Sequence, residues 1–540
     1  MTDQTIHTIT IDKADIMDGG MKSYKQDDDS IILITRDDNT FHAFDGKCPH
    51  AGADLGTGLR CGNRVVCPWH HATFDSTDGS LLEPIATHGL TQYELKDDGD
   101  SLTVNTAMTL NKAVENNKLS DTHTLIVGGG GAGFMTAHQL RHSGYGGKIT
   151  LISQEATAPY NRPLLSKAFL AGNMPEEKLL LGGADWAQKN NIEVRLNQTV
   201  SDVLPNERTV VIRNKDTNDA NDASQKISAD YLVVATGAQP IVPPIKGAES
   251  DGVYTLRSMD DAKAIKAASE NRNVVIVGTG FIGMEVASAL SQAGTPTSIT
   301  VIGQTNRVME NIISETVSNA LIKLHQDNGI TFILDATVNA ITNDNKQVSG
   351  VTLADGTHLD AEIVVLGTGV SPRTDLLAEV NDPDGVQVDS HLQLRDGVYA
   401  LGDIANAKGQ MGRLRIEHWR VAMQHGLVTA AAILQDDSIE SLESRIPFFW
   451  TMQYGKSLRY SGHAATPDHN ILLGTPDALN YIEYYFDDDG EDSRASAAST
   501  LGRDQELVAF SELLRRGVAP TRAQITAGFD IIAQAHALSA

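Results

Sequence analysis

The segment Thr124–Leu140, TLIVGGGGAGFMTAHQL, constrains the fold of this chain more than any other stretch. Its first residues, up to Val127, read as a short buried strand, and the apolar spacing becomes helical from Phe134. The turn between them has the pattern G-x-G-x-x-G, with its glycines at Gly128, Gly130 and Gly133. A strand, a glycine turn and a helix in this order direct backbone N–H groups and the positive helix end toward a pyrophosphate.

A second strand, predicted at Lys148–Ile152, makes this interpretation specific. It ends at Gln154 and Glu155, and a carboxylate at this point of a dinucleotide-binding unit accepts hydrogen bonds from ribose hydroxyls. A lone G-x-G-x-x-G can be a plain turn, whereas the complete unit with its acid is typical of a Rossmann-like site. The segment therefore predicts an α/β domain that binds a dinucleotide.

The same unit occurs again about 150 residues further along the chain. A strand at Asn273–Val277 leads through a glycine turn into a helix at Met284–Ala293 and a strand at Ser298–Ile302. The glycines of this second turn are Gly278, Gly280 and Gly283. Further buried strands that run into glycine turns are predicted at Tyr231–Val234, Ile363–Leu366 and Val398–Leu401. We interpret the pattern as an internal duplication in which the second unit is inserted into the first.

The first hundred or so residues follow a different pattern. Short alternating or β-branched runs, separated by Asp, Asn and Gly, predict a small all-β domain. The predicted strands are Ile31–Thr35, Thr40–Phe44, Arg64–Cys67 and Thr91–Leu95. Asn105–Thr122 is polar, and we interpret it as a linker with space for one short helix. Strand-like runs at Ile471–Leu473 and Tyr481–Phe486 and a final helix are predicted in the tail, with a solvated acidic loop at Asp487–Asp492.

Two Cys/His motifs lie in the first domain. Cys48-Pro49-His50 and Cys67-Pro68-Trp69-His70 are separated by sixteen residues. C-x-H followed by C-x-x-H at this spacing is the ligand set of a Rieske [2Fe–2S] centre, in which two thiolates bind one iron and two imidazoles the other. The alternative is a zinc site, but zinc sites favour C-x2–4-C with H-x3–5-H. The mixed pairs favour the Rieske centre, with Cys48, His50, Cys67 and His70 as ligands.

The other cysteine and the neighbouring histidine have simpler expected roles. Cys61 has no partner, and we expect a small buried side chain. His71 matches no ligand position, and we expect it on the surface or beside the ligands. Because all three cysteines precede residue 70, the rest of the chain holds no redox dithiol.

Several segments resemble oxygenase-coupled ferredoxin reductases and apoptosis-inducing factors. These are PYNRPLLSK at 159–167, ATG at 235–237 and YALGD at 399–403. Leu164 departs from the family, which usually has a second proline there. In the tail, Glu417-His418-Trp419 and the run from Phe449 to Tyr460 are similar to apoptosis-inducing-factor-like proteins with an N-terminal Rieske domain. The resemblance covers nearly the whole chain and implies FAD as cofactor and NADH or NADPH as substrate.

The resemblance also implies roles for individual residues. Gly128, Gly130, Gly133 and Glu155 would hold the AMP half of FAD. Arg162 and Lys167 would reach the phosphate and the isoalloxazine, and Asp403 the ribitol. Lys167 would pair with Glu285 near flavin N5 as the catalytic pair; a helix N-terminal acid satisfied by the dipole is the alternative for Glu285. Trp419 and Trp450 would flank the flavin, although buried core tryptophans are the alternative. The remaining cofactor-binding residues would be Val200, Ala235, Thr236, Gly237, Gly278, Gly280, Ile282, Gly283, Gln304 and Gly369.

Taken together, the patterns predict a multidomain fold. It has an all-β Rieske domain, two Rossmann-like α/β domains of the two-dinucleotide-binding flavoprotein type, and an α+β C-terminal domain. The predicted division is Rieske domain 1–108, linker 109–122, FAD-binding domain 123–255 and 375–440, NAD(P)-binding domain 256–374 and C-terminal interface domain 445–540.

Charge and hydropathy exclude several classes of partner. The net charge of −26 argues against nucleic acid or an anionic membrane surface. No apolar run approaches the ~18 residues that span a bilayer. The N-terminus has neither a basic segment nor an apolar one, so we expect a cytoplasmic protein. A homodimer is compatible with the resemblance.

These features predict an oxidoreductase in which a hydride passes from NAD(P)H to FAD and single electrons pass to the [2Fe–2S] cluster and an unidentified acceptor. One alternative is an NADH-responsive, slowly turning over redox-signalling protein of the apoptosis-inducing factor type. Another alternative is an enzyme that reduces nitrite, but such an enzyme would need further cysteines for a sirohaem site, and none remain in this chain. For the nucleotide we predict weak discrimination: Gly303-Gln304 stands where an acid would repel a 2′-phosphate, and Arg307 is the only basic residue near.

Overall fold

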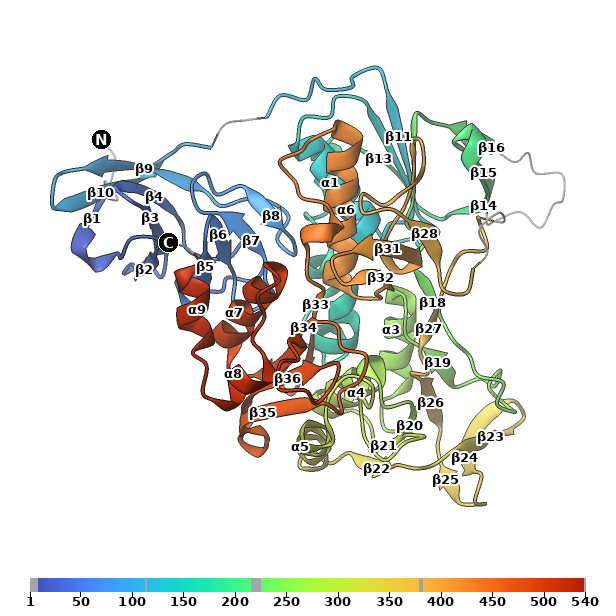
Figure 1. The fold of residues 1–540 in the computed structure, drawn as a ribbon. Helices are drawn as coiled ribbons and strands as arrows, with labels where there is room; N and C mark the ends of the chain where they lie inside the picture. Colours follow the sequence, from blue (N-terminus) through green and yellow to red (C-terminus); the bar gives the residue numbers. More distant parts are fainter. Residues whose placement is uncertain (1–7, 112–113, 215–224, 378–381, 539–540) are drawn as a thin grey trace, which may run out of the picture.

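Residues 8–111, 114–214, 225–377 and 382–538 are described by a computed structural model (Figure 1). Residues 8–109 form two antiparallel sheets. The order of the larger sheet is β1 (Thr8–Asp12), β10 (Ser101–Thr109), β9 (Gln92–Asp97), β4 (Thr40–Asp45), β3 (Ile31–Asp37) and β2 (Met21–Lys25). The smaller sheet has β5 (Leu59–Cys61), β6 (Arg64–Val66), β7 (Thr73–Asp75) and β8 (Leu81–Glu83) in sequence order.

The first dinucleotide-binding unit builds a six-stranded sheet. Its order is β13 (Glu193–Arg195), β12 (Lys148–Ile152), β11 (His123–Val127), β17 (Tyr231–Val234), β30 (Val398–Ala400) and β29 (Gln393–Arg395), parallel except for β29. Helices α1 (Gly131–His142) and α6 (Trp419–Leu434) pack together beside it (Figure 1). The accompanying smaller sheets are β14 (Gln198–Leu204), β15 (Thr209–Asn214) and β16 (Gln225–Ser228), and β28 (Val386–Val388), β31 (Ala405–Gly409) and β32 (Gly412–Arg415). A short helix, α2 (Trp186–Lys189), precedes β13.

The second unit repeats this plan in a five-stranded parallel sheet. Its order is β19 (Val253–Thr255), β26 (Ile363–Leu366), β20 (Asn273–Val277), β21 (Ser298–Ile302) and β22 (Thr331–Ile333). The helices of this unit are α3 (Met259–Ala268), α4 (Phe281–Ala293) and α5 (Glu315–Gln326). A three-stranded sheet of β23 (Val338–Asp344), β24 (Gln347–Leu353) and β25 (His358–Asp360) extends it, and the pair β18 (Ala238–Pro240) and β27 (Val370–Pro372) joins the two units.

The C-terminal region is an antiparallel sheet covered by helices. The strand order is β33 (Phe448–Gln453), β34 (Lys456–Gly462), β37 (Ala495–Leu501), β36 (Asn480–Phe486) and β35 (Asn470–Thr475). Helices α7 (Asp504–Arg515), α8 (Arg522–Thr526) and α9 (Ile531–Ala537) follow. In Figure 1 this red region lies beside the blue N-terminal sheets. Leu59 and Val66 from those sheets share one buried apolar cluster with Leu507 and Phe510 of α7.

Two local expectations from the sequence are wrong. The polar segment after Asn105 continues β10 as far as Thr109, which pairs with Tyr93 of β9, and the described residues of 110–122 contain no helix. Both glycine turns pass into helix earlier than the apolar spacing suggested, at Gly131 and Phe281, because the turn residues themselves adopt helical geometry.

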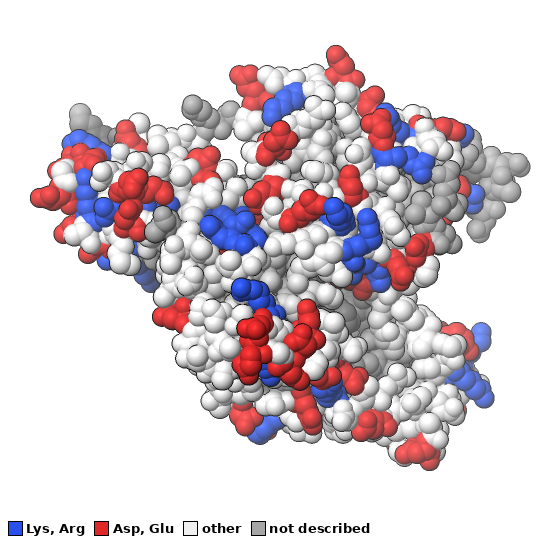
Figure 2. All heavy atoms as spheres, in the orientation of Figure 1, with Lys and Arg blue, Asp and Glu red and all other residues white. Residues whose placement is uncertain are grey.

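Two expected properties of the surface can be compared with the structure. Acidic and basic side chains are interspersed on the face shown in Figure 2, and residues Asp487–Asp492 are exposed. Among the helices of the described residues, none has the length and apolar character needed to cross a membrane.

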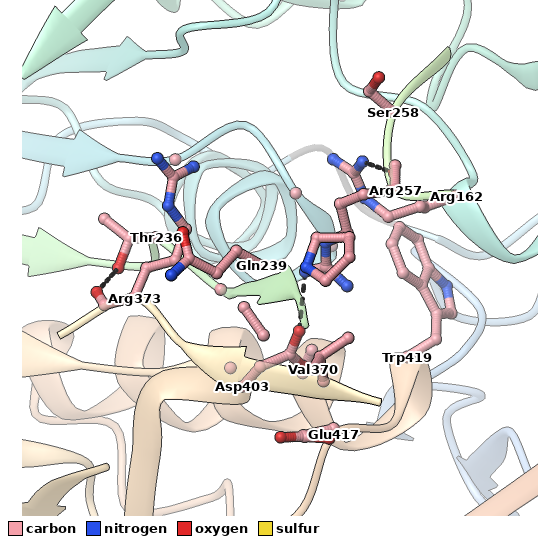
Figure 3. Close-up of a pocket in the computed structure, with 18 of the residues that line it drawn as sticks. Arg162, Thr236, Gln239, Arg257, Ser258, Val370, Arg373, Asp403, Glu417 and Trp419 are labelled. Carbon is pink, nitrogen blue, oxygen red and sulfur yellow. Dashed lines mark hydrogen bonds and ion pairs between the residues drawn. The ribbon is translucent and has the colours of Figure 1, made fainter. Parts of the chain in front are cut away.

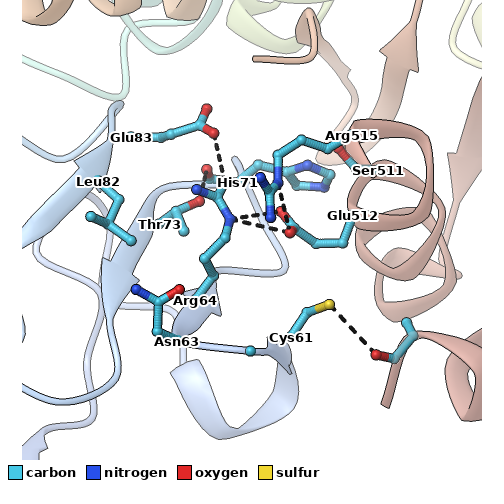
Figure 4. A network of polar contacts seen from close by, with 12 residues as sticks. Cys61, Asn63, Arg64, His71, Thr73, Leu82, Glu83, Ser511, Glu512 and Arg515 are labelled. Carbon is cyan, nitrogen blue, oxygen red and sulfur yellow. Dashed lines mark hydrogen bonds and ion pairs between the residues drawn. The ribbon is translucent and has the colours of Figure 1, made fainter. Parts of the chain in front are cut away.

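A buried carboxylate, Glu83 of β8, joins the N-terminal sheets to the other domains (Figure 4). Its Oε1 accepts from Arg64 at 2.6 Å, and its Oε2 accepts from Arg420 and Gln424 of α6, both at 2.7 Å. Arg64 also donates to Glu512 of α7 at 3.1 Å. Because α6 and α7 both meet this network, it fixes the N-terminal sheets against two separate parts of the chain.

Electrostatics decide the charge of Glu83. Burial alone raises its pKa, but the attraction of Arg420, Arg64 and Arg445 outweighs burial and holds the pKa well below its usual range. The carboxylate therefore stays ionised. Breaking such a buried group of charges leaves arginines unpaired, which typically destabilises a protein by about 3–5 kcal/mol.

We therefore predict that Glu83→Gln lowers the free energy of unfolding by roughly 3–5 kcal/mol, measured by urea titration at neutral pH. A depressed pKa gives stability that is present above the unfolded-state value, here 4.5, and is lost as pH falls below it. The wild-type protein should thus lose stability more steeply than the variant between pH 4.5 and 3. Glu443→Gln, at an exposed acid that pairs with Lys408, is the control and should leave stability close to that of the wild type. Equal stability of Glu83→Gln and wild type would contradict the assignment.

Candidate functional site

A cavity of about 950 Å³ lies where the two dinucleotide-binding units meet strand β33 (Figure 3). This volume is at the upper end of the range that small-molecule sites occupy. Most of the residues predicted to bind cofactor line it: Gly128, Gly130, Glu155, Arg162, Lys167, Val200, Ala235, Thr236, Gly237, Gly280, Ile282, Glu285, Gly369, Asp403, Trp419 and Trp450.

The two glycine turns are built alike. Gly128 has a φ of +117° and Gly278 a φ of +118°, a conformation that favours glycine. A Cβ on either would also lie within 2.3 Å of a carbonyl oxygen of the neighbouring strand connection. In contrast, a Cβ on Gly130 or Gly280 would meet no atom within 4 Å, and both residues line the cavity. Each turn therefore leaves open space beside backbone N–H groups, which fits the pyrophosphates of FAD and of the nicotinamide nucleotide.

Four predicted residues lie outside the cavity lining. Gly133 and Gly283 sit where helix meets turn, since a Cβ on either would lie 2.0 Å from the carbonyl oxygen of Gly128 or Gly278. Gly278 shapes the second turn without facing the cavity. Gln304 is exposed just beyond β21, at the position expected to meet the adenosine ribose of the nicotinamide nucleotide.

Charged groups in the cavity are held in pairs. Arg162 donates to Glu155 at 2.7 Å, and the hydroxyl of Tyr160 donates to the same carboxylate at 2.6 Å. Across the cavity, Arg257 pairs with Asp403 at 2.8 Å (Figure 3). Arg257 was not predicted, because it belongs to no motif and reaches Asp403 only through the fold.

The predicted ion pair between Lys167 and Glu285 is present. Lys167 Nζ lies 2.7 Å from Glu285 Oε2, and both side chains are buried. Ser166 donates to Oε2 of Glu285, and Thr451 of β33 donates to Oε1 at 2.8 Å. Lys167 lies in a π-helical turn, Leu165–Phe169, and turns of this kind are frequent at functional sites. The carboxylate balances the buried ammonium, and two segments, the Leu165–Phe169 turn and strand β33, hold it in place.

A further residue of the lining carries an aromatic ring that the sequence analysis did not assign. His418, the N-cap of α6, stacks on Phe449 with ring centroids 4.3 Å apart. Burial lowers its pKa to about 4, so the imidazole is neutral at physiological pH. It supplies a flat, uncharged wall to the cavity.

The predicted cluster ligands come together at the end of the N-terminal sheets. The thiols of Cys48 and Cys67 interact with each other, and the rings of His50 and His70 lie 4.7 Å apart. The two cysteines are buried and free. Within the described residues, no three His, Cys, Asp or Glu side chains are arranged around a single ion; these four instead form a thiol pair and an imidazole pair.

The state of the imidazoles fits iron ligation. His70 Nδ1 is buried and makes no hydrogen bond to the described residues, so this nitrogen is available to bind a metal. Burial lowers the pKa of His50 to about 4. Burial also lowers the pKa of His70, and the nearby groups His50, Arg459 and Lys167 lower it further by electrostatic repulsion, to about 2. Both rings are therefore neutral, which is the form that binds a metal.

Strand β33 lies between the cluster ligands and the cavity. Trp450 lines the cavity, and its ring centroid lies 4.5 Å from that of His70. Two residues earlier, Phe448 stacks on His71 at 4.0 Å. Since side chains alternate along a strand, Thr451 points the other way, to Glu285. The surface position considered for His71 is therefore wrong, because Phe448 buries the ring beside the ligand loop.

Comparisons with known proteins agree with this geometry. Residues 122–426 match the family "Pyridine nucleotide-disulphide oxidoreductase", and residues 7–94 match "Rieske [2Fe-2S] domain", which excludes the zinc alternative. Apoptosis-inducing factor 3 of Homo sapiens is 29% identical over 92% of this chain and 82% of its own length. Rubredoxin-NAD(+) reductase of Ectopseudomonas oleovorans is 32% identical over 65% of this chain and 88% of its own.

A solved structure is similar over the same region. The ferredoxin reductase for the CYP199A2 system from Rhodopseudomonas palustris has a TM-score of 0.70 and 26% identity, covering 77% of this chain and all of that one.

We predict that His50→Ala and His70→Ala each lose the absorption and EPR signals of the [2Fe–2S] cluster but keep FAD and its reduction by NADH. The reason is that the imidazoles belong to loops outside the FAD cavity. Iron, labile sulfide and flavin analysis of the purified variants measures both outcomes. His88→Ala, at an exposed histidine in the loop between β8 and β9, is the control and should retain the cluster. A variant at either ligand position that keeps the signal would show that the ligand assignment is wrong.

Proposed function

The chain belongs to the pyridine nucleotide-disulphide oxidoreductase family and carries a Rieske [2Fe–2S] domain ahead of it, and we propose that it passes electrons from NAD(P)H through FAD to its own Rieske cluster and on to a separate acceptor. It is an oxidoreductase that uses these cofactors. The observation that carries the proposed path is the position of Trp450, which lines the flavin cavity and contacts the ring of His70.

The residues of the cavity have distinct parts in this proposal. FAD supplies the conversion of a two-electron hydride into single electrons. The glycine turns and the carboxylates of Glu155 and Asp403 would bind and orient it. Lys167 would place a positive charge where reduction adds negative charge, and Glu285 makes burial of that charge tolerable. The aromatic rings of His418 and Trp419 would exclude water from one wall.

The absence of thiols supports an acceptor other than a disulfide. No cysteine is among the described residues that line the cavity, and all three cysteines of the chain precede residue 70. Electrons therefore leave by another route than the dithiol that the family name implies. The buried ligand loop against Trp450 supports the Rieske cluster as that route.

For the terminal acceptor we propose a small electron-carrier protein. Relatives named as rubredoxin and ferredoxin reductases support this class. The similarity to apoptosis-inducing factor 3 favours a second candidate, an NADH-responsive signalling protein that is reoxidised slowly. The rate of reoxidation by carrier proteins separates the two candidates, since every acceptor would act slowly on the second.

The remaining sequence-based expectations stay proposals. The separate sheets support the division into Rieske domain 1–108, linker 109–122, FAD-binding domain 123–255 and 375–440, NAD(P)-binding domain 256–374 and C-terminal domain 445–540. The contacts of the last region with both the Rieske sheets and the flavin cavity support its part as an interface domain. A cytoplasmic location and a homodimer remain predictions.

We predict that Trp450→Leu slows reduction of the cluster at least about tenfold, or ~1.4 kcal/mol in activation free energy, while FAD reduction by NADH stays within a factor of about two. Electron transfer weakens steeply when a bridging ring is replaced by a gap. Anaerobic stopped-flow absorbance follows the flavin, and freeze-quench EPR follows the cluster.

The matched control is Trp69→Leu, which removes a half-exposed tryptophan that precedes His70 in the chain and lies outside the cavity. It should leave cluster reduction within a factor of about two of wild type. Equal effects of the two substitutions, or none from Trp450→Leu, would reject the path through Trp450.

For the nucleotide we predict weak discrimination. Gln304 carries no charge that would repel a 2′-phosphate, and Arg307, the nearby cation, is paired with Asp468 at 3.3 Å. NADH and NADPH should both reduce the flavin, with kcat/KM values within one or two powers of ten, about 1.4–2.8 kcal/mol. Gln304→Glu should shift the preference toward NADH, whereas Gln326→Glu, at an exposed site on α5, should not. A wild-type preference beyond about a thousandfold would overturn the prediction.

A further inference from the structure

A buried arginine from the C-terminal sheet lies against the cluster's ligand loop. Arg459 of β34 is only 8% exposed. Its Nε donates to the carbonyl oxygen of Trp69 at 2.6 Å. Trp69 lies in the short loop between Cys67, which would bind one iron, and His70, which would bind the other. A permanent positive charge is therefore fixed within hydrogen-bond distance of the backbone that joins the two ligands.

The strand register explains how the arginine reaches this loop. Trp450 of β33 and Arg459 of β34 are directly opposite each other in the antiparallel pair. Side chains of opposite residues share one face of a sheet. One cross-strand pair thus contacts the ligand loop twice, since Trp450 meets the ring of His70 and Arg459 meets the carbonyl of Trp69.

The charge of Arg459 is only partly balanced. Its Nη1 lies 2.8 Å from Asp504 Oδ1 at the start of α7, and the side chain of Asp504 is 26% exposed against 9% for Arg459. Water therefore screens the carboxylate more than the guanidinium. On the buried side the guanidinium meets the ligand loop, so its charge acts on the cluster more strongly than that of Asp504.

We propose that Arg459 raises the reduction potential of the Rieske cluster and so favours the flow of electrons toward it. Reduction adds one negative charge to the cluster, and a nearby fixed cation stabilises the reduced form more than the oxidised one. The inference rests on the proposed function for its purpose, because a higher potential matters when FAD delivers the electron. The C-terminal region would then adjust the reduction potential of the cluster as well as hold its ligand loop in place.

The test is the midpoint potential of the cluster in the full-length holoprotein, measured by mediated redox titration with EPR detection. Arg459→Gln should lower the equilibrium constant for one-electron reduction about tenfold, which is ~59 mV. Arg459→Lys keeps the charge and should stay close to wild type. Asp504→Asn removes the balancing carboxylate and should raise the potential.

The control is Arg522→Gln, which neutralises an arginine of α8 beside β35, at the opposite edge of the same sheet. It should leave the potential unchanged. An unchanged potential in Arg459→Gln, or equal shifts in the Gln and Lys variants, would overturn the proposal. If Arg459→Gln fails to retain the cluster, Asp504→Asn decides, because a potential equal to or below that of wild type contradicts a role of the Arg459 charge.

This titration is independent of the proposed electron path. Chemical mediators reduce the cluster directly, so the effect of Arg459 is measured whether or not FAD delivers electrons to it. Failure of NADH to reduce the cluster in wild type would instead contradict the proposed function alone.

Discussion

The ion network around Glu83 is the interaction on which the arrangement of the redox sites depends. It joins β8 of the Rieske domain to α6 and α7, and its members Glu83, Arg64, Arg420 and Glu512 are all buried. A network of this kind is weak evidence for stability as such, because desolvation offsets much of the attraction. The network does, however, favour one docked position of the Rieske domain, since a different position would leave buried charges unpaired. The Rieske ligand loops are thereby held against β33 in one orientation.

Strand β33 lies between the flavin cavity and the Rieske ligand loop and contacts both. Alternate residues of this strand contact different parts of the chain. The rings of Phe448 and Trp450 contact His71 and His70 of the Rieske ligand loop, whereas Thr451 donates a hydrogen bond to Glu285 of the ion pair. Helix α6 also meets both regions, because Trp419 and Arg420 line the cavity and Arg420 reaches Glu83. Residues of β33 and α6 therefore line the cavity and also contact the Rieske ligand loop or Glu83.

The sequence predicted those parts of the site that depend on local backbone geometry. The glycine turns and the Cys/His pairs follow from short motifs whose chemistry requires particular residues at particular spacings, whereas the pair of Lys167 and Glu285 was expected only from the family resemblance. The Glu83 network, the contact of Trp450 with His70 and the pair of Arg257 with Asp403 could not be predicted. Each joins residues that are far apart in the chain, and nothing local in FFWTMQ or around Glu83 indicates which partner it meets. His71 shows the same limit, because only the position of Phe448 decides that its ring is buried.

The most direct test of the account is anaerobic mixing of the holoprotein with one equivalent of NADH, with flavin absorbance and cluster EPR followed together. The flavin should be reduced first, and the cluster signal of the same molecules should appear next, at a rate that does not depend on protein concentration. A reduced flavin beside a cluster that stays oxidised, or cluster reduction that rises with protein concentration, would contradict transfer within the chain.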